Sequence, residues 1–252
     1  MIIYLFAPIL FLCWGSFLNV VAYRLTHEIS FFAPRSQCPH CRHLLAWHDL
    51  MPVLSWLWLR GRCRYCTQPI SWLYPFIELL TVIIMTLSMF TLDSAYWPAY
   101  ALFFSALIVS IRTDLETMLI SRYATLALVP VGIMLSFLGF LPITAYTSLL
   151  GAFFGYYLMW SIRAVFKCMT GKVGIGQGDL DLMALIGAFT GALGCWVTLS
   201  IGSIVGALLG SLYLTLTKQS TTRPLPFGPF LALSACAYVF AQHFFAHVFL
   251  SV

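Results

Sequence analysis

Residues 174–217 read GIGQGDLDLMALIGAFTGALGCWVTLSIGSIVGALLGSLYLTLT, and no charged residue follows Asp181 in this stretch. A transmembrane helix needs about 20 apolar residues, so the stretch is long enough for two crossings. We predict helices over 181–195 and 196–217 with a break near Gly194. Asp179 stands at the entrance to the first helix, where a carboxylate beside hydrocarbon is costly. Asp179 is therefore a candidate functional residue.

The composition of the whole chain agrees with a membrane protein. Hydrophobic residues make up 61% of the chain and charged residues 8%, and the mean hydropathy is +0.93. These values exclude an ordinary soluble domain. Six further apolar runs are found, at 2–23, 73–92, 96–111, 123–141, 143–162 and 229–251. The sequence therefore predicts an all-α polytopic membrane protein with about eight transmembrane helices.

The basic residues predict how the chain is oriented. All 13 Lys and Arg residues fall in four segments, 24–71, 112–122, 163–180 and 218–228. Loops rich in Lys and Arg stay in the cytoplasm, so we expect these segments on the cytoplasmic side and both termini outside the cytoplasm. The net charge of +5 is then explained by topology and anionic lipid headgroups, and no nucleic-acid partner is expected.

Four cysteines form a spaced cluster in the first cytoplasmic segment. They are Cys38 and Cys41 in one C-x-x-C pair and Cys63 and Cys66 in another. Two such pairs are typical of a structural zinc site with four thiolate ligands. Two disulfides or four free thiols are the alternative, although disulfides are rare in a reducing cytoplasm. We predict three regions: a first transmembrane helix at 1–23, a zinc-ribbon-like tetracysteine domain at 24–71, and a seven-helix membrane domain at 72–252.

A second lone aspartate, Asp114, follows the run 96–111 and lies on the same predicted membrane face as Asp179. Two carboxylates in a site of low dielectric constant can share one proton. The ionised member then takes a proton from water while the neutral member polarises a carbonyl group. Gly176 and Gly178 lack Cβ atoms and would let an unwound backbone approach an extended peptide. The pattern thus predicts a pair of acids that can act on the carbonyl group of an extended peptide.

Other interpretations of these acids remain open. Glu116 and Asp181 each lie two residues from a candidate aspartate, on the opposite face of a helix, and periodicity does not choose between the members of each pair. An aspartate at the start of a helix, where Asp179 is expected, is also a common helix cap. A proton- or ion-coupled transporter would use intramembrane acids as well. A non-enzymatic scaffold would explain the cysteines and leave the aspartates without a role.

Several motifs together resemble the type IV prepilin peptidases, which are bacterial inner-membrane leader peptidases and N-methyltransferases. The resemblance covers essentially the whole chain. In its N-terminal part it rests on Gly15-Ser16-Phe17-Leu18-Asn19-Val20, Arg24-Leu25, Cys38-Pro39-His40-Cys41, Pro52, Gly61-Arg62-Cys63-Arg64-Tyr65-Cys66, Ile70-Ser71, Tyr74-Pro75 and Glu78. Further on, it rests on Asp114-Leu115 with Ile120, and on Gly176-Gln177-Gly178-Asp179-Leu180 followed by Leu182, Ala184 and Gly187.

This resemblance implies that Asp114 and Asp179 are the catalytic pair. It implies cleavage of the basic leader of type IV prepilins or type II secretion pseudopilins after a glycine, at the cytoplasmic membrane surface. Methylation of the new N-terminus with S-adenosylmethionine would follow. A Gly-x-Gly-Asp intramembrane protease acting on other membrane helices is the nearest alternative.

The chain departs from the family pattern at three positions. Thr26 and Ser121 stand where proline is usual, and Asp181 stands where lysine is frequent. The last departure reverses a charge close to Asp179. It leaves both aspartates of the expected pair in place.

Overall fold

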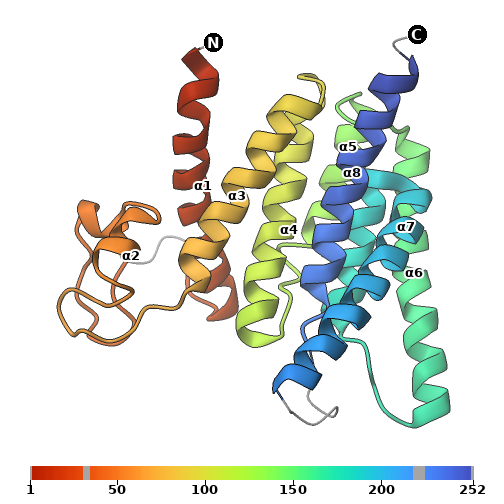
Figure 1. The fold of residues 1–252 in the computed structure, drawn as a ribbon. Helices are drawn as coiled ribbons and strands as arrows, with labels where there is room; N and C mark the ends of the chain where they lie inside the picture. The colour runs from red at the N-terminus through yellow and green to blue at the C-terminus, as the bar shows by residue number, and fades with distance from the viewer. Residues whose placement is uncertain (1, 31–34, 218–224, 251–252) are drawn as a thin grey trace. The chain divides into compact units, whose positions relative to one another are not determined.

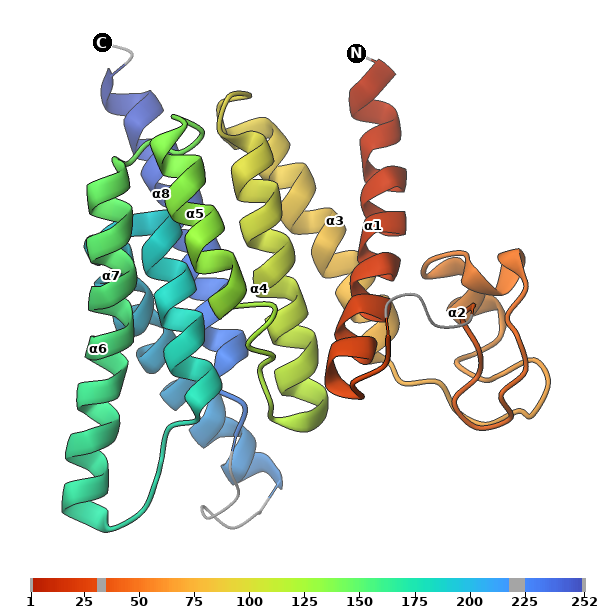
Figure 2. The same cartoon turned by 180° about the vertical axis from the view of Figure 1, so that it is seen from behind.

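The computed structural model describes residues 2–30, 35–217 and 225–250. It divides into two compact units, Met1–Phe90 and Thr91–Val252. Helices build both units, and the described residues contain two isolated β-bridges and no β-strand (Figures 1 and 2). The predicted fold class, an all-α membrane protein with a tetracysteine loop, is confirmed.

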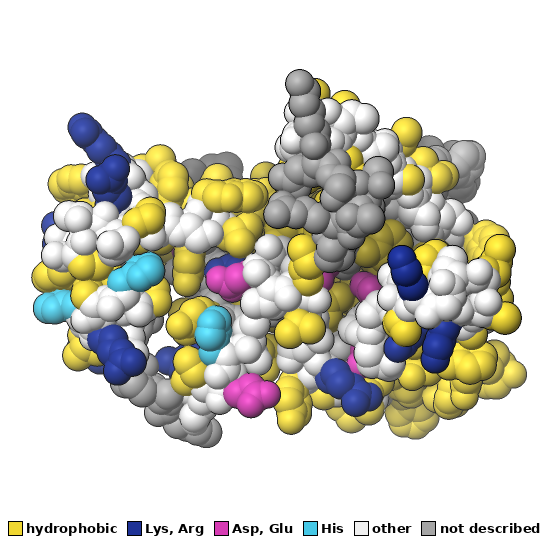
Figure 3. All heavy atoms as spheres, turned by 90° about the horizontal axis from the view of Figure 1, so that it is seen from below, with side chains coloured by type: hydrophobic (Ala, Val, Ile, Leu, Met, Phe, Trp, Pro, Cys, Tyr) yellow, Lys and Arg dark blue, Asp and Glu magenta, His cyan; other side chains and the backbone are white. Residues whose placement is uncertain are grey.

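Five of the described helices are long and apolar enough to cross a membrane. Many large apolar side chains on them are exposed, such as Phe153 and Leu208, which suits surfaces that face lipid. In the view of Figure 3, Lys and Arg side chains lie beside exposed hydrophobic side chains. The protein is therefore a multi-pass membrane protein.

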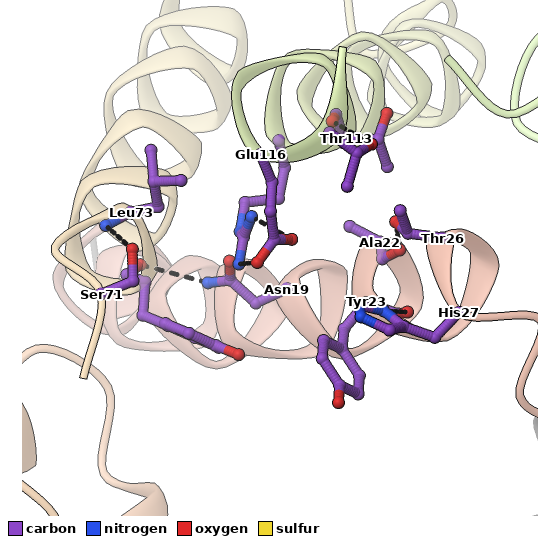
Figure 4. A network of polar contacts seen from close by, with 12 residues as sticks. Asn19, Ala22, Tyr23, Thr26, His27, Ser71, Leu73, Thr113 and Glu116 are labelled. Atoms are coloured by element: carbon purple, nitrogen blue, oxygen red, sulfur yellow. Dashed lines mark hydrogen bonds and ion pairs between the residues drawn. The ribbon is translucent and has the colours of Figure 1, made fainter. Parts of the chain in front are cut away.

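The first unit contains the helices α1 (Ile2–Thr26) and α3 (Leu73–Thr91), which pack closely. A Cβ atom placed on Gly15 of α1 would lie 2.9 Å from Cα of Glu78 in α3. Asn19 donates a hydrogen bond of 3.1 Å from Nδ2 to the backbone oxygen of Tyr74, and Figure 4 shows its side chain directed toward the first turn of α3. Glycine and asparagine thus fix the contact between these helices.

The segment between α1 and α3 is mostly irregular, with a 3₁₀ turn η1 (Trp47–Leu50) and a short helix α2 (Leu54–Trp58). The buried carboxylate of Glu78 accepts a hydrogen bond of 2.7 Å from the backbone N–H of Val53. The Trp56 indole donates to the backbone oxygen of Ile70 at 3.2 Å. Glu78 therefore holds this polar segment against α3.

The second unit contains α4 (Trp97–Thr117), the 3₁₀ turn η2 (Leu126–Leu128), α5 (Val129–Phe137), α6 (Ala145–Thr170), α7 (Gln177–Thr217) and α8 (Gly228–Leu250). Aromatic rings join α4 to its neighbours: Phe103 stacks on Phe189 of α7 at 4.8 Å between centroids, and Phe104 lies 5.3 Å from Phe240 of α8. These contacts join α4, α7 and α8 in one core.

Helices α6 and α7 approach through glycines. A Cβ atom on Gly187 would lie 2.0 Å from the backbone oxygen of Gly151, which leaves no room for a side chain. Ser148 donates a hydrogen bond of 2.6 Å to the backbone oxygen of Ala188 across the same interface. This close approach is the small-residue packing expected between helices in lipid.

The helical assignment of α7 runs through Gly191, but that residue has φ 75° and interrupts the helix. A continuous helix of 41 residues would be about 60 Å long at 1.5 Å per residue, twice the thickness of the bilayer core. After Gly191 the chain turns back toward the end at which α7 begins (Figures 1 and 2). Two apolar helices were predicted here, and the interruption lies three residues before the predicted break.

Several predicted boundaries were wrong, among them that of the run 143–162, because α6 continues to Thr170. The run 96–111 ends where charges begin, but α4 continues to Thr117, so Asp114 lies inside the helix instead of after it. The run 123–141 forms a turn and a helix of nine residues that begins beside Pro130, because proline favours the first helical turn. Residues 218–224, which include the predicted cytoplasmic Lys218 and Arg223, lie outside the described residues.

Candidate active site and metal centre

Asp114 lies in the last turn of α4 with its side chain buried. Its Oδ2 atom accepts a hydrogen bond of 2.9 Å from the backbone N–H of Gly228, the first residue of α8. The positive end of a helix dipole favours a negative charge at this place. The start of α8 therefore orients the Asp114 carboxylate.

Asp179 is the third residue of α7, and its side chain is half-buried. Its Oδ2 atom accepts a hydrogen bond of 3.2 Å from the backbone N–H of Gly176, the residue just before the helix. This contact is one half of a capping box. The carboxylate of Asp179 thus caps the first turn of α7.

Ile120 connects the two aspartates through the glycines beside them. A Cβ atom on Gly178 would lie 2.7 Å from Cβ of Ile120, and one on Gly228 would lie 2.9 Å both from Cδ1 of Ile120 and from Oδ2 of Asp114. The loop after α4 therefore packs against the starts of α7 and α8. This packing brings Asp114 and Asp179 into one region of the second unit.

The two glycines of the predicted active-site loop differ in their surroundings. Gly176 lies in the unwound chain before α7, and the nearest atom to a Cβ placed there is Oδ2 of Asp179 at 3.4 Å. Gly178 lies inside the first helical turn, directly against Ile120. Gly176 is thus open to an approaching chain, whereas Gly178 is required for packing.

The two rival acids are held by arginines. Glu116 binds the buried Arg112 with oxygen to nitrogen distances of 2.6 and 3.3 Å. Asp181 is fully buried, and its Oδ2 atom lies 2.9 Å from Nε of Arg122. The hydrogen bonds described above for Asp114 and Asp179 come from backbone N–H groups.

Sequence reasoning missed two residues of this site, Gly228 and Arg122. Gly228 precedes Pro229 at the start of the last apolar run, and proline in a first helical turn is the signal that would have marked the start of α8. Arg122 was counted for topology alone. Its contact with Asp181 spans 59 residues of sequence, and no local pattern predicts it.

The four predicted metal ligands come together in the first unit. The sulfur atoms of Cys38, Cys41, Cys63 and Cys66 all lie within 4.8 Å of one another, and those of Cys38 and Cys66 are 3.8 Å apart. Zinc–sulfur bonds of about 2.3 Å in a tetrahedron place sulfur atoms about 3.8 Å apart. The cluster therefore fits a zinc ion.

The two C-x-x-C pairs share one backbone shape. Arg42 donates from its backbone N–H to the oxygen of Cys38, and Thr67 donates likewise to Cys63, at 2.9 and 3.0 Å. Both donors have positive φ angles, 56° and 58°. Each loop thus turns its two sulfur atoms toward the same centre.

The thiols of the second pair differ in acidity. The backbone N–H of Cys66 lowers the pKa of Cys63 to about 7 despite burial. The backbone N–H of Gln68 also favours ionisation of Cys66, but desolvation and the neighbouring thiols raise the pKa of Cys66 to about 11. Four crowded thiols cannot all ionise easily without a cation between them, and a divalent metal supplies that charge.

Comparison with known proteins finds a family match in each of the two compact units. The family described as the Bacterial Peptidase A24 N-terminal domain matches residues 9–92, and the Type IV leader peptidase family matches residues 101–211. A protein of Aeromonas hydrophila named prepilin leader peptidase/N-methyltransferase is 37% identical over 245 residues, which cover 87% of this chain and 84% of the relative. The chain belongs to the type IV leader peptidase family.

Other relatives in this family carry the same name. The protein from Stutzerimonas stutzeri is 33% identical over 254 residues, covering 90% of this chain and 87% of its own length. The protein from Burkholderia pseudomallei strain 1026b is 35% identical over 263 residues, covering 93% of this chain and 84% of its own length. No solved structure matches the chain. The matched leader peptidase region contains both Asp114 and Asp179.

Proposed function

We propose that this protein removes the leader from type IV prepilins or type II secretion pseudopilins and methylates the new N-terminus. The observation that carries the proposal is the convergence of Asp114 and Asp179 at the joined starts of α7 and α8, in a member of the type IV leader peptidase family. The similar proteins from Aeromonas and Stutzerimonas bear the name of this activity.

In the proposed mechanism, the two aspartates act on a water molecule and the scissile carbonyl. The ionised carboxylate accepts a proton from water, and the neutral carboxylate donates a hydrogen bond to the carbonyl oxygen. The N–H of Gly228 orients Asp114, and the N–H of Gly176 orients Asp179. Gly176 leaves room beside Asp179 for the backbone of an extended substrate.

The positions of the aspartates within their helices favour a peptidase over a transporter. Asp114 lies in the last turn of α4 and Asp179 in the first turn of α7. Coupling sites of transporters typically lie near the middle of the membrane. A leader peptide that stays in the cytoplasm would present its cleavage site at a membrane surface, where helix ends are found.

The tetracysteine cluster supports a structural role for zinc. Cys38, Cys41, Cys63 and Cys66 would hold the ion, and a closed shell of four thiolates has no open position for substrate. The ion would tie together two loops of a segment that contains little regular structure. S-adenosylmethionine is the proposed methyl donor because the relatives are named N-methyltransferases. The described residues show no donor-binding motif, so no methyl-transfer step is assigned to particular side chains.

The orientation proposed for the chain places segments 24–71, 112–122, 163–180 and 218–228 in the cytoplasm and both termini outside. The membrane would be the bacterial inner membrane, as the family resemblance implies. The proposed domains are the first helix at 1–23, the tetracysteine domain at 24–71 and the peptidase domain at 72–252.

One experiment tests both activities. The purified full-length protein is incubated in detergent with a prepilin and S-adenosylmethionine, and the product mass is measured. We expect loss of the leader after the glycine and then the addition of one methyl group. An intact prepilin, or cleavage at another position, would reject the peptidase proposal, and a cleaved but unmethylated product would reject the transferase.

A further inference from the structure

Asp181 is an acid of the second unit that the proposed catalytic steps do not use. It is fully buried in the first turns of α7, and each of its two carboxylate oxygens has a hydrogen-bond partner. Oδ2 lies 2.9 Å from Nε of Arg122, and Oδ1 accepts a hydrogen bond of 3.3 Å from Nε2 of Gln177. A carboxylate held in this way is a poor general acid or base, but it is a strong anchor for other groups.

Gln177 extends this contact to α6. Its Nε2 atom also donates to the hydroxyl of Tyr156 at 3.2 Å, and its Oε1 atom accepts from Nη1 of Arg163 at 3.0 Å. Gln177 is the first residue of α7 and stands between Gly176 and Gly178. The side chain in the middle of the glycine turn is therefore held by groups from α6 and from α7 itself.

Arg122 brings in the loop that follows α4. The same loop carries Ile120, which contacts Gly178 and Gly228. Two points of attachment, two residues apart, therefore join this loop to the start of α7: the Ile120 contact and the Arg122–Asp181 ion pair. Asp114 lies in the last turn of α4 and Asp179 in the first turn of α7, so both attachments join the segments that carry the two carboxylates.

We propose that Asp181, together with Arg122, is a positioning residue that aligns the Gly176–Asp179 turn with the Asp114 end of α4. The proposal rests on the proposed peptidase function, since it assigns the effect of the ion pair to cleavage. Asp181 and Arg122 act through Gln177 and the loop, without touching the substrate. Misplacement of a reacting group by about 1 Å can cost 10²-fold in rate, so the expected effect is on kcat more than on KM.

Charge reversal tests the proposal in the full-length protein. The single variants are Asp181→Lys and Arg122→Asp. The double variant carries both changes and restores an ion pair in which the positive and negative side chains have exchanged positions. We expect each single variant to lower kcat for prepilin cleavage by about 10- to 100-fold, with little change in KM. The kcat of the double variant should be at least tenfold higher than that of the less active single variant. Lys172→Asp, an exposed charge reversal near the same turn, should cleave like the parent.

A second measurement does not depend on activity. Hydrogen exchange of the backbone in residues 172–181 should be faster in both single variants and slower again in the double variant. All comparisons are made at a temperature where every variant is folded. Single variants with parental kcat, or a double variant no better than the singles in both measurements, would overturn the positioning role. A parent protein that cleaves no prepilin would instead reject the proposed function, and the exchange result would still decide the role of Asp181 in the turn.

Discussion

At the scale of the residue, partner groups separate the four acids that sequence periodicity leaves equivalent. Glu116 and Asp181 each bind an arginine, whereas Asp114 and Asp179 accept hydrogen bonds from the backbone at helix starts. An arginine bound to a carboxylate occupies the oxygen atoms that would otherwise contact water or substrate. Asp114 and Asp179 are thus the acids better suited to share a proton, in agreement with the family resemblance.

The two glycines beside Asp179 lead to a first prediction. Gly178→Ala should reduce stability by about 1–3 kcal/mol, because its Cβ would lie 2.7 Å from Cβ of Ile120 and displace that loop. Gly176→Ala should leave stability unchanged, because the nearest atom is 3.4 Å away. Thermal unfolding of both purified variants in the same detergent measures the difference.

The same two variants test how the substrate approaches. If Gly176 admits the prepilin backbone, Gly176→Ala should raise KM for cleavage although the protein remains as stable as the parent. Equal unfolding temperatures for the two variants would contradict the packing described for Gly178. A parental KM for Gly176→Ala would contradict the role of Gly176 in substrate approach.

The sequence predicted part of this site and not the rest, for physical reasons. Arg112 and Glu116 are four residues apart on one helix, so the spacing in the sequence is enough to predict their ion pair. The pairing of Arg122 with Asp181 and the bond from Gly228 to Asp114 join distant segments. Such contacts depend on how helices pack, which hydropathy does not encode.

At the scale of the element, apolar runs located the helices but not their ends. Helix α4 continues past the apolar run because Arg112 and Glu116 neutralise each other on its last turns. The interruption of α7 occurs at Gly191 instead of Gly194. Both are glycines in an apolar run, and the difference lies in the contact with α6, where a Cβ placed on Gly151 would lie 2.7 Å from Cα of Gly191.

The tetracysteine element leads to a second prediction. Purified protein should contain about one zinc ion per chain, and Cys66→Ser should lose it, because a site with four ligands requires all of its thiolates. Metal analysis by mass spectrometry measures the zinc. Limited proteolysis should then cut the segment between α1 and α3 faster in the variant, since the ion links its two loops.

Cys168→Ser is the matched control for this measurement. Cys168 is an exposed cysteine of α6 outside the cluster, so its replacement should leave the zinc content and the proteolysis pattern unchanged. Purified parent protein that is stable and free of zinc would refute the metal site. Zinc retained at the parental level by Cys66→Ser would refute the assignment of that ligand.

At the scale of the whole molecule, two independent divisions of the chain agree. The chain divides into its two compact units between Phe90 and Thr91, and the two family matches cover residues 9–92 and 101–211. Helix α3, which the proposed domains assign to the peptidase part, lies in the same compact unit as the tetracysteine segment, to which the Glu78–Val53 hydrogen bond joins it. Both candidate aspartates lie in the second unit.

The membrane orientation is a third prediction. A cysteine introduced at Lys172 should react with a membrane-impermeant thiol reagent only after the inner membrane is opened, whereas one introduced at Asp93 should react in intact spheroplasts. Both positions are exposed, and the positive-inside rule places them on opposite sides. Replacement by serine of Cys13 and Cys168, the exposed cysteines outside the tetracysteine cluster, keeps the background low. Labelling of both positions in intact spheroplasts would contradict the proposed topology.

The most direct test of the central claim is cleavage of a prepilin by Asp114→Asn and Asp179→Asn, each purified as a folded full-length protein. We predict that each variant loses about 10²–10⁴-fold in cleavage rate, the contribution typical of a general acid or base. Asp93→Asn, which changes an exposed aspartate between α3 and α4, should cleave like the parent. A folded Asp114→Asn or Asp179→Asn variant that cleaves at the parental rate would contradict the assignment of the catalytic pair.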